Sequence, residues 1–263
     1  MIEIRHKKTG DLLLQLEAED AANGGLVGKD LSGADLRNTA WLGRNLAGVN
    51  LTEADLRGIN LLSSSLKGAN LSRALLWRAD LQYTDLTDCC LQGASLTSAQ
   101  LFYPRLQGAQ LQGAGFSFAR LTECDLSGQD LAGARMRYAI LTGVKLSGAD
   151  LTDANLLGAF FKKCDLQTAQ MRRAKLIASV FIHVDWKDAD LTDAVFTNTC
   201  FVNCTNLHGA KGLDTIQHRG PSSLDVATLR SSVHALPDYF LTGMGYAEAE
   251  IAAWRKMYPT GDS

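Results

Sequence analysis

The chain places a large apolar residue at every fifth position from Leu26 to Phe201, and this period limits the folds that it can adopt. The column has 36 consecutive members over 176 residues, without an insertion or a deletion. A helical face repeats about every 3.6 residues and a strand face every second residue, so neither element alone explains the period. A fixed period of this kind indicates a repeat architecture in which each unit packs on its neighbours.

A second column, of small residues, lies two positions before the apolar column and holds Ala in 19 repeats, beginning with Ala34. Residues two apart in an extended chain point to the same side, so both columns face inward. Because five is odd, the next apolar residue faces inward only if the chain bends once per repeat. Right-angled bends close a square coil in four repeats, which predicts an all-β solenoid of about nine stacked coils.

Glycine marks the expected corner, two residues after the apolar column, and 14 of the 24 glycines lie there. Glycine accepts the positive φ that the second corner of a type II turn requires. This glycine column ends after Gly158, while Phe161, Phe181 and Phe201 enter the apolar column one coil apart. We therefore predict a second turn type and an aromatic ladder in the last coils. Pro104 lacks a backbone donor, which predicts a local bulge.

The repeat has the form A-(D/N)-L-x-x and is complete at Ala34-Asp35-Leu36, Ala54-Asp55-Leu56, Ala69-Asn70-Leu71, Ala149-Asp150-Leu151, Ala154-Asn155-Leu156 and Ala189-Asp190-Leu191. Over about two-thirds of its length the chain therefore resembles the pentapeptide-repeat proteins. The resemblance implies a right-handed quadrilateral β-helix. It also implies one activity to weigh, mimicry of DNA directed at DNA gyrase or topoisomerase.

The sequence divides into three parts. Residues 1–25 predict an N-terminal β-hairpin cap, because two apolar runs flank the turn residues Thr9-Gly10-Asp11. Residues 26–206 hold the β-helix, and residues 207–263 predict a C-terminal helical cap. Within that cap, Ser222 is expected to be the N-cap residue of the first helix. Open sheet edges at both ends of a solenoid require such caps.

The charge balance limits the partners that we expect. The chain has 26 basic and 28 acidic residues, and residues 26–206 hold 18 and 17. This balance argues against direct nucleic-acid binding, which favours a basic chain, and against a uniformly acidic DNA mimic. We expect no membrane segment, because no run of about 18 apolar residues occurs. Six cysteines without a disulfide framework favour the cytoplasm.

No arrangement of residues predicts catalysis, a cofactor or a metal. Cys200, Cys204 and His208 fall in different columns, whereas zinc needs four converging ligands. Three of the cysteines share one inward face and are expected to be core residues: Cys124, Cys164 and Cys204. Ser222, Asp225 and His234 have the residue types of a catalytic triad. The serine, however, is better explained as a helix cap. We therefore expect a protein that is not an enzyme.

Outward apolar residues near the C-terminal end predict a buried contact. The candidate interface residues are Ile140, Phe160, Val180, Ile182, Val202, Ile251, Trp254 and Tyr258. Either the chain's own C-terminal segment covers them or a partner does. We expect a protein-binding or scaffold module with an unidentified protein partner, and a homodimer through the C-terminal end is one form of it. A gyrase-directed DNA mimic is the alternative.

Overall fold

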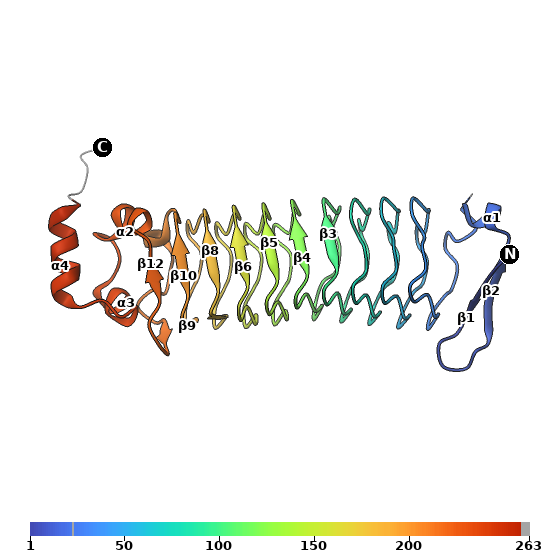
Figure 1. Cartoon of the computed structure of the whole chain (residues 1–263), viewed down its shortest axis with the longest axis horizontal. Coiled ribbons are helices and arrows are strands. Elements are labelled where there is room, and N and C mark those ends of the chain that lie inside the picture. Colours follow the sequence, from blue (N-terminus) through green and yellow to red (C-terminus); the bar gives the residue numbers. More distant parts are fainter. Residues whose placement is uncertain (23, 259–263) are drawn as a thin grey trace.

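The computed structural model describes residues 1–22 and 24–258 and shows a long rod, with a hairpin at one end and helices at the other (Figure 1). Residues 23 and 259–263, which belong to the expected caps, lie outside the described residues. Within the described part, no helix is long and apolar enough to cross a membrane. The strands are β1 (Ile2–Arg5), β2 (Leu12–Leu16), β3 (Gln100–Phe102), β4 (Arg120–Thr122), β5 (Ile140–Thr142), β6 (Phe160–Lys162), β7 (Lys175–Ile177), β8 (Val180–Ile182), β9 (Val195–Thr197), β10 (Cys200–Val202), β11 (Gln217–His218) and β12 (Ser223–Leu224). The helices are α1 (Ala18–Ala22), the short 3-10 helix η1 (Leu207–Gly209), α2 (Val226–Ser232), α3 (Asp238–Gly243) and α4 (Glu248–Met257).

Successive coils of the rod stack in parallel with an offset of 20 residues. Bridges in this register begin with Asp30 and Asn50 and continue to Asp185 and Thr205. Backbone amides donate to carbonyls of the next coil, as from Leu31 N to Asn50 O at 2.8 Å. The fold is a right-handed quadrilateral β-helix, and its four sides follow from the period of five.

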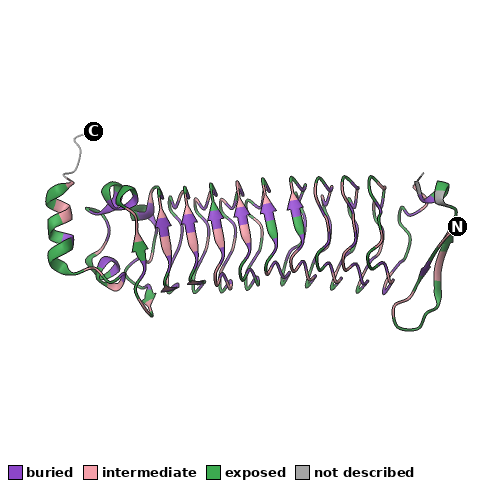
Figure 2. Cartoon of the chain, viewed as in Figure 1, coloured by how far each residue is buried: buried purple, intermediate pink, exposed green. Residues whose placement is uncertain are grey.

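The apolar column fills the axis of the rod. All 36 members are buried, and Trp41 in the first coils is the most exposed of them at 7%. Burying each such side chain stabilises the fold by about 1.5–3 kcal/mol. Phe161 stacks on Phe181 with ring centroids 4.8 Å apart, and Phe181 stacks on Phe201 at 5.4 Å, which confirms the predicted aromatic ladder. The middle residue of each strand from β3 to β10 is buried in the same way (Figure 2).

Regular strands occupy fewer coils than the nine expected from the sequence. One parallel sheet contains β3, β4, β5, β6, β8 and β10, one from each of six consecutive coils, and ends in β12. The coils before residue 100 are joined by isolated bridges, because tight turns leave too few extended residues for a full strand. The 20-residue register nevertheless continues through both halves of the rod.

Every corner has the same backbone conformation, with or without glycine. The residue two positions after each of the 36 apolar residues has a positive φ, and 22 of these residues are not glycine. Ala178 and His183, for example, both have a φ of 54°. A residue with a β-carbon is strained there by about 1–2 kcal/mol. The end of the glycine column therefore does not mark a change of turn, and that part of the prediction is wrong.

A second turn type does occur, but it lies mainly on one face of the rod. At most corners the residue in the small column donates to the apolar residue three positions earlier, as from Ala134 N to Leu131 O at 2.9 Å. Within the described chain this bond is missing after β4, β5, β6 and β8, where Cys or Val replaces Ala. At these corners the extended segment is a three-residue strand. Val49 and Cys89, which occupy the small column on another face, keep the bond, so side-chain size alone does not determine the turn.

Pro104 does not produce the predicted bulge. β3 keeps the 20-residue register with β4, and Arg105 N donates to Thr84 O at 3.0 Å. On this face the amides of Cys124 and Val144, which occupy the position of Pro104 one and two coils later, make no backbone hydrogen bond in the described structure. Proline therefore removes a donor that the ladder does not use.

Both ends of the β-helix are capped. The hairpin of β1 and β2 contacts the first coils through an antiparallel bridge between His6 and Ala34. At the other end, β12 extends the main sheet and three helices follow (Figure 1). The N-cap residue of α2 is Asp225, whose carboxylate accepts from Thr228 N at 2.9 Å. The prediction that Ser222 caps this helix is wrong, because its buried hydroxyl accepts from Thr199 N.

Candidate functional site

Five of the candidate interface residues form one continuous surface. Ile140, Phe160 and Val180 lie on the outer side of β5, β6 and β8 in adjacent register positions. Ile182 and Val202 form a shorter column beside them on β8 and β10. All five side chains remain partly exposed. We call these five residues the apolar strip.

The C-terminal helices do not cover the apolar strip. β12 pairs with β10, so this segment lengthens the sheet at its end, and the helices follow beyond it (Figure 1). The three candidate residues of α4 have other contacts. Ile251 is buried, the ring of Trp254 packs edge-on against Tyr246 at 4.8 Å, and the Tyr258 ring lies 5.3 Å from the guanidinium carbon of Arg230. They hold the helical cap together and do not join the strip.

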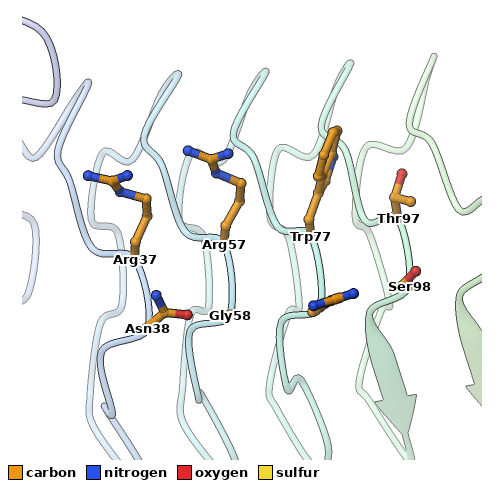
Figure 3. A pocket seen from close by; sticks show the side chains of 8 residues that line it. Arg37, Asn38, Arg57, Gly58, Trp77, Thr97 and Ser98 are labelled. Carbon is orange, nitrogen blue, oxygen red and sulfur yellow. The ribbon is translucent and has the colours of Figure 1, made fainter.

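Acidic and basic residues lie on different faces of the rod, although their total numbers are nearly equal. One face, which we call the acidic face, carries seven carboxylates against four basic residues: Asp30, Glu53, Asp130, Asp150, Asp153, Asp190 and Asp193, with Arg73, Arg172, Arg173 and Lys211. A neighbouring face, which we call the arginine face, carries seven basic residues against two aspartates: Arg37, Arg57, Arg78, Arg135, Arg137, Lys175 and Arg219, with Asp35 and Asp55. Figure 3 shows one end of the arginine face. Grouping residues 20 apart would have found this pattern in the sequence.

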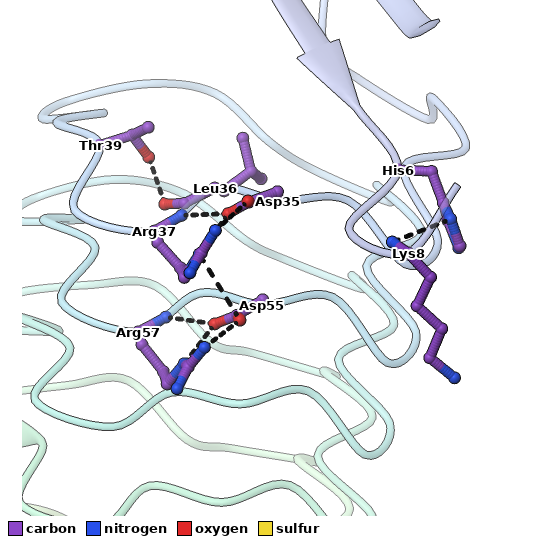
Figure 4. A network of polar contacts seen from close by, with 8 residues as sticks. All are labelled: His6, Lys8, Asp35, Leu36, Arg37, Thr39, Asp55 and Arg57. Atoms are coloured by element: carbon purple, nitrogen blue, oxygen red, sulfur yellow. Dashed lines mark hydrogen bonds and ion pairs between the residues drawn. The ribbon is translucent and has the colours of Figure 1, made fainter. Parts of the chain in front are cut away.

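Aspartates in the column before the apolar residue bind arginines two positions later (Figure 4). Arg57 donates to both carboxylate oxygens of Asp55, at 2.8 and 2.6 Å, and Arg37 binds Asp35 in the same way. Asp55 is only 5% exposed. Burial raises the pKa of its carboxyl, but the hydrogen bonds from Arg57 outweigh burial and the pKa is lowered. These pairs are structural, and each carboxylate balances the positive charge of its arginine, so each pair has no net charge.

The cysteines show no reactive arrangement within the described chain. Cys124, Cys164 and Cys204 are buried, and each donates to a backbone carbonyl of the preceding coil. Burial raises the pKa of the Cys124 thiol to about 12 and those of Cys164 and Cys204 to about 11. A thiol with so high a pKa is a poor nucleophile and a poor metal ligand at neutral pH. They pack as small core side chains.

The three residues with the types of a catalytic triad do not come together in the structure. Ser222 accepts from the backbone of Thr199, Asp225 caps α2, and His234 contacts the carbonyl oxygen of Tyr258. Each polar group therefore has its own structural partner. The described residues also contain no group of three or more His, Cys, Asp or Glu side chains placed to hold a metal ion, so Cys200, Cys204 and His208 do not converge on one.

The family is decided by the match to pentapeptide repeats, found in eight copies over residues 30–68, 59–97, 105–128, 130–167 and 169–205. The chain belongs to the pentapeptide-repeat family. The matched residues cover the coils in which the 20-residue register is observed. Pentapeptide-repeat proteins are in general structural or binding modules. Among curated proteins, none matches this chain.

Solved structures similar to this pentapeptide-repeat chain come from several sources. HetL, a pentapeptide repeat protein involved in heterocyst differentiation regulation in the cyanobacterium Nostoc sp. strain PCC 7120, is 28% identical over 75% of this chain and 90% of its own, with a TM-score of 0.44. QnrB1, a plasmid-mediated fluoroquinolone resistance protein, is 20% identical over 84% and 96%, with a TM-score of 0.41. A pentapeptide repeat protein of the Arabidopsis thaliana thylakoid lumen is 29% identical over 36% and 66%, with a TM-score of 0.28.

Proposed function

We propose that this chain is a non-enzymatic protein-binding scaffold that docks a partner on the apolar strip. The observation that carries the proposal is an apolar surface over four coils that stays partly exposed, with the helical cap beyond its end. Burial of apolar area drives protein association. The hydrogen-bonded register holds these side chains in fixed positions, so little ordering accompanies binding. A cytoplasmic location belongs to the same proposal.

Replacing apolar side chains of the strip by acidic ones tests this proposal. The double variant Phe160→Asp/Ile182→Asp places two charges on the strip, which a partner would have to desolvate. The immobilised variant is compared with wild type for quantitative capture of proteins from extracts of cells that express the chain. We expect at least one protein to be captured by wild type and lost from the variant.

A matched variant controls for the added charge. Gln92→Asp/Gln112→Asp adds two carboxylates to exposed positions on the acidic face, opposite the strip. It should retain the protein that Phe160→Asp/Ile182→Asp loses, and both variants should unfold at temperatures near that of wild type. Equal capture by all three proteins would refute docking on the strip.

The acidic face favours a second candidate, a DNA-mimicking modulator of DNA gyrase or topoisomerase, which the family resemblance implies. Seven carboxylates along one side of a rod provide part of the charge pattern of a duplex. The basic residues of the neighbouring arginine face work against this candidate. Supercoiling by purified gyrase, with and without the chain, distinguishes the two functions. Altered supercoiling supports the mimic, and an unchanged rate at large molar excess of the chain removes it.

Self-association is one form of the scaffold proposal. A homodimer through the C-terminal end would use the last coils and the helical cap. Size-exclusion chromatography with light scattering at high micromolar concentration measures the mass directly, against a monomer of 28.4 kDa. A mass twice that value supports the homodimer. A monomeric mass leaves a different protein as the partner.

A further inference from the structure

The arginine face forms an unbroken ladder along the rod. Its outward column runs from Asp35 and Asp55 through bridges in the 20-residue register to Lys175, and then through β7, β9 and β11 to Gln217. Nine coil steps at about 4.8 Å make this surface roughly 43 Å long. Arg37, Arg57 and Trp77 point the same way from successive coils (Figure 3).

The free positive charge on this face lies beyond its first two coils. Arg37 and Arg57 are bound to Asp35 and Asp55. The remaining basic residues have no carboxylate within 4.0 Å in the described structure: Arg78, Arg135, Arg137, Lys175 and Arg219. Seven basic residues against two acidic ones leave an excess of five positive charges on one side of a nearly neutral rod.

Three aromatic side chains stand among these charges. Trp77, Phe118 and Tyr138 are 48%, 55% and 44% exposed. The rings of Phe118 and Tyr138 stack at 5.1 Å with an angle of 20°, and the Trp77 indole donates to Ser95 Oγ at 2.6 Å. These contacts hold the rings in place without covering them. Exposed rings that are fixed in this way resemble stacking platforms.

An open groove lies at one end of the same surface. It has a volume of about 490 Å³, and Arg57, Trp77, Arg78 and Ser98 are among the residues that line it. Figure 3 shows its lining side chains. Gly58 leaves its floor without a side chain. Arg37 and Arg57 in its lining are bound to carboxylates, so Arg78 supplies the free guanidinium beside the Trp77 ring. A free guanidinium beside an indole ring suits a ligand that has both a flat aromatic part and an anionic part.

We propose that the arginine face binds single-stranded nucleic acid, with bases on the exposed rings and phosphates on the arginines. An acidic peptide would satisfy the arginines but would leave the three rings without a role. A duplex keeps its bases stacked inside and cannot use the rings. A near-zero total charge disfavours nucleic-acid binding only where the charge is evenly spread, and the folded chain concentrates positive charge on this face.

Fluorescence anisotropy with a labelled oligothymidylate of about 15 nucleotides at low salt tests this proposal. We expect binding that weakens steeply as salt increases. Trp77→Ala and Phe118→Ala should each weaken binding about tenfold, because each removes one stacking contact. Arg135→Gln/Arg137→Gln should weaken binding and reduce the slope of log affinity against log salt by about two.

Matched variants on other faces separate this surface from the chain as a whole. Tyr83→Ala removes a ring of similar exposure, 52%, from the sheet side of the rod. Arg105→Gln/Arg120→Gln removes two exposed arginines that form no ion pair in the described structure. Both variants should bind as wild type does, and circular dichroism should show all five variants folded.

Three outcomes would overturn the proposal. The first is no binding of the oligonucleotide at low salt. The second is equal weakening by the control variants. The third is displacement of the oligonucleotide by polyglutamate with no effect of Trp77→Ala, which would assign the face to an acidic protein segment instead.

Discussion

At the scale of single residues, the corner positions show how the coil tolerates sequence variation. A corner needs a positive φ, which glycine adopts freely and an L-residue adopts at a cost of about 1–2 kcal/mol. Yet 22 of 36 corners have a β-carbon. Inter-coil hydrogen bonds and the buried apolar column offset this strain, so the core determines the fold and the corners adjust to it.

Glycine at a strained corner should therefore stabilise the chain. Ala178 has a φ of 54°, so Ala178→Gly relieves strain and should raise stability by about 1 kcal/mol. Ala132 is an exposed residue directly before a corner, and its φ is not positive. Ala132→Gly should therefore lower stability by about 0.5–1 kcal/mol. Thermal unfolding of the two variants beside wild type measures the difference. The same sign of change in both would contradict this explanation of the corners.

The buried carboxylate of Asp190 should make the fold sensitive to acid. Burial raises its pKa, but hydrogen bonds from the Thr192 hydroxyl and amide and from Arg172 outweigh burial and lower it. A carboxyl with a lowered folded-state pKa stabilises the fold above its ordinary pKa of 3.8 and loses this contribution as the pH falls. Asp190→Asn should cost about 1–3 kcal/mol at pH 7. Urea unfolding at pH 7 and pH 3.5 should show a smaller difference in unfolding free energy between wild type and Asp190→Asn at the lower pH. The same difference at both pH values would contradict a role for the ionised carboxylate.

At the scale of elements, the helical cap is joined to the β-helix through an aromatic contact. The ring of His218 on β11 packs edge-on against Phe196 of the last coil and Phe240 of α3, with centroids 6.1 and 5.8 Å away, and these two rings also contact each other at 6.2 Å. Both its nitrogens are buried without a hydrogen-bond partner in the described structure. Burial lowers the pKa of His218, so the folded chain holds this imidazole neutral.

This histidine should weaken the cap as the pH falls. The unfolded state binds a proton below the ordinary pKa of 6.5, and the folded state resists protonation, so stability decreases from about pH 6.5 downward. His218→Phe keeps a ring at the site and loses no hydrogen bond. It should unfold at nearly the same temperature at pH 7.5 and pH 5.5, whereas wild type should unfold at a lower temperature at pH 5.5. Parallel pH profiles of the two proteins would exclude His218 as the cause.

At the scale of the whole molecule, the period of five predicted most of the fold but little of the surface. The buried column, the square coil and the Phe161 ladder follow from inward-facing residues, which packing constrains strongly. Both caps follow from the open sheet edges at the ends of a solenoid. The bulge predicted at Pro104 is absent because the amide at that position is not used by the turn of this face. Ser222 does not cap α2 because its hydroxyl pairs with the last coil instead. The arginine face is formed by residues that lie 20 positions apart in the sequence and become neighbours only in the folded coil.

Photo-cross-linking from two surface positions tests directly whether a partner docks on the apolar strip. Thr142 lies beside the apolar strip, and Thr152 takes the equivalent position on the opposite face, ten residues later. Both threonines are partly exposed, so a photoreactive residue fits either position without disturbing the core. In extracts of cells that express the chain, we expect a discrete cross-linked partner from position 142 and none from position 152. No adduct from position 142, or the same adducts from both positions, would contradict docking on the apolar strip.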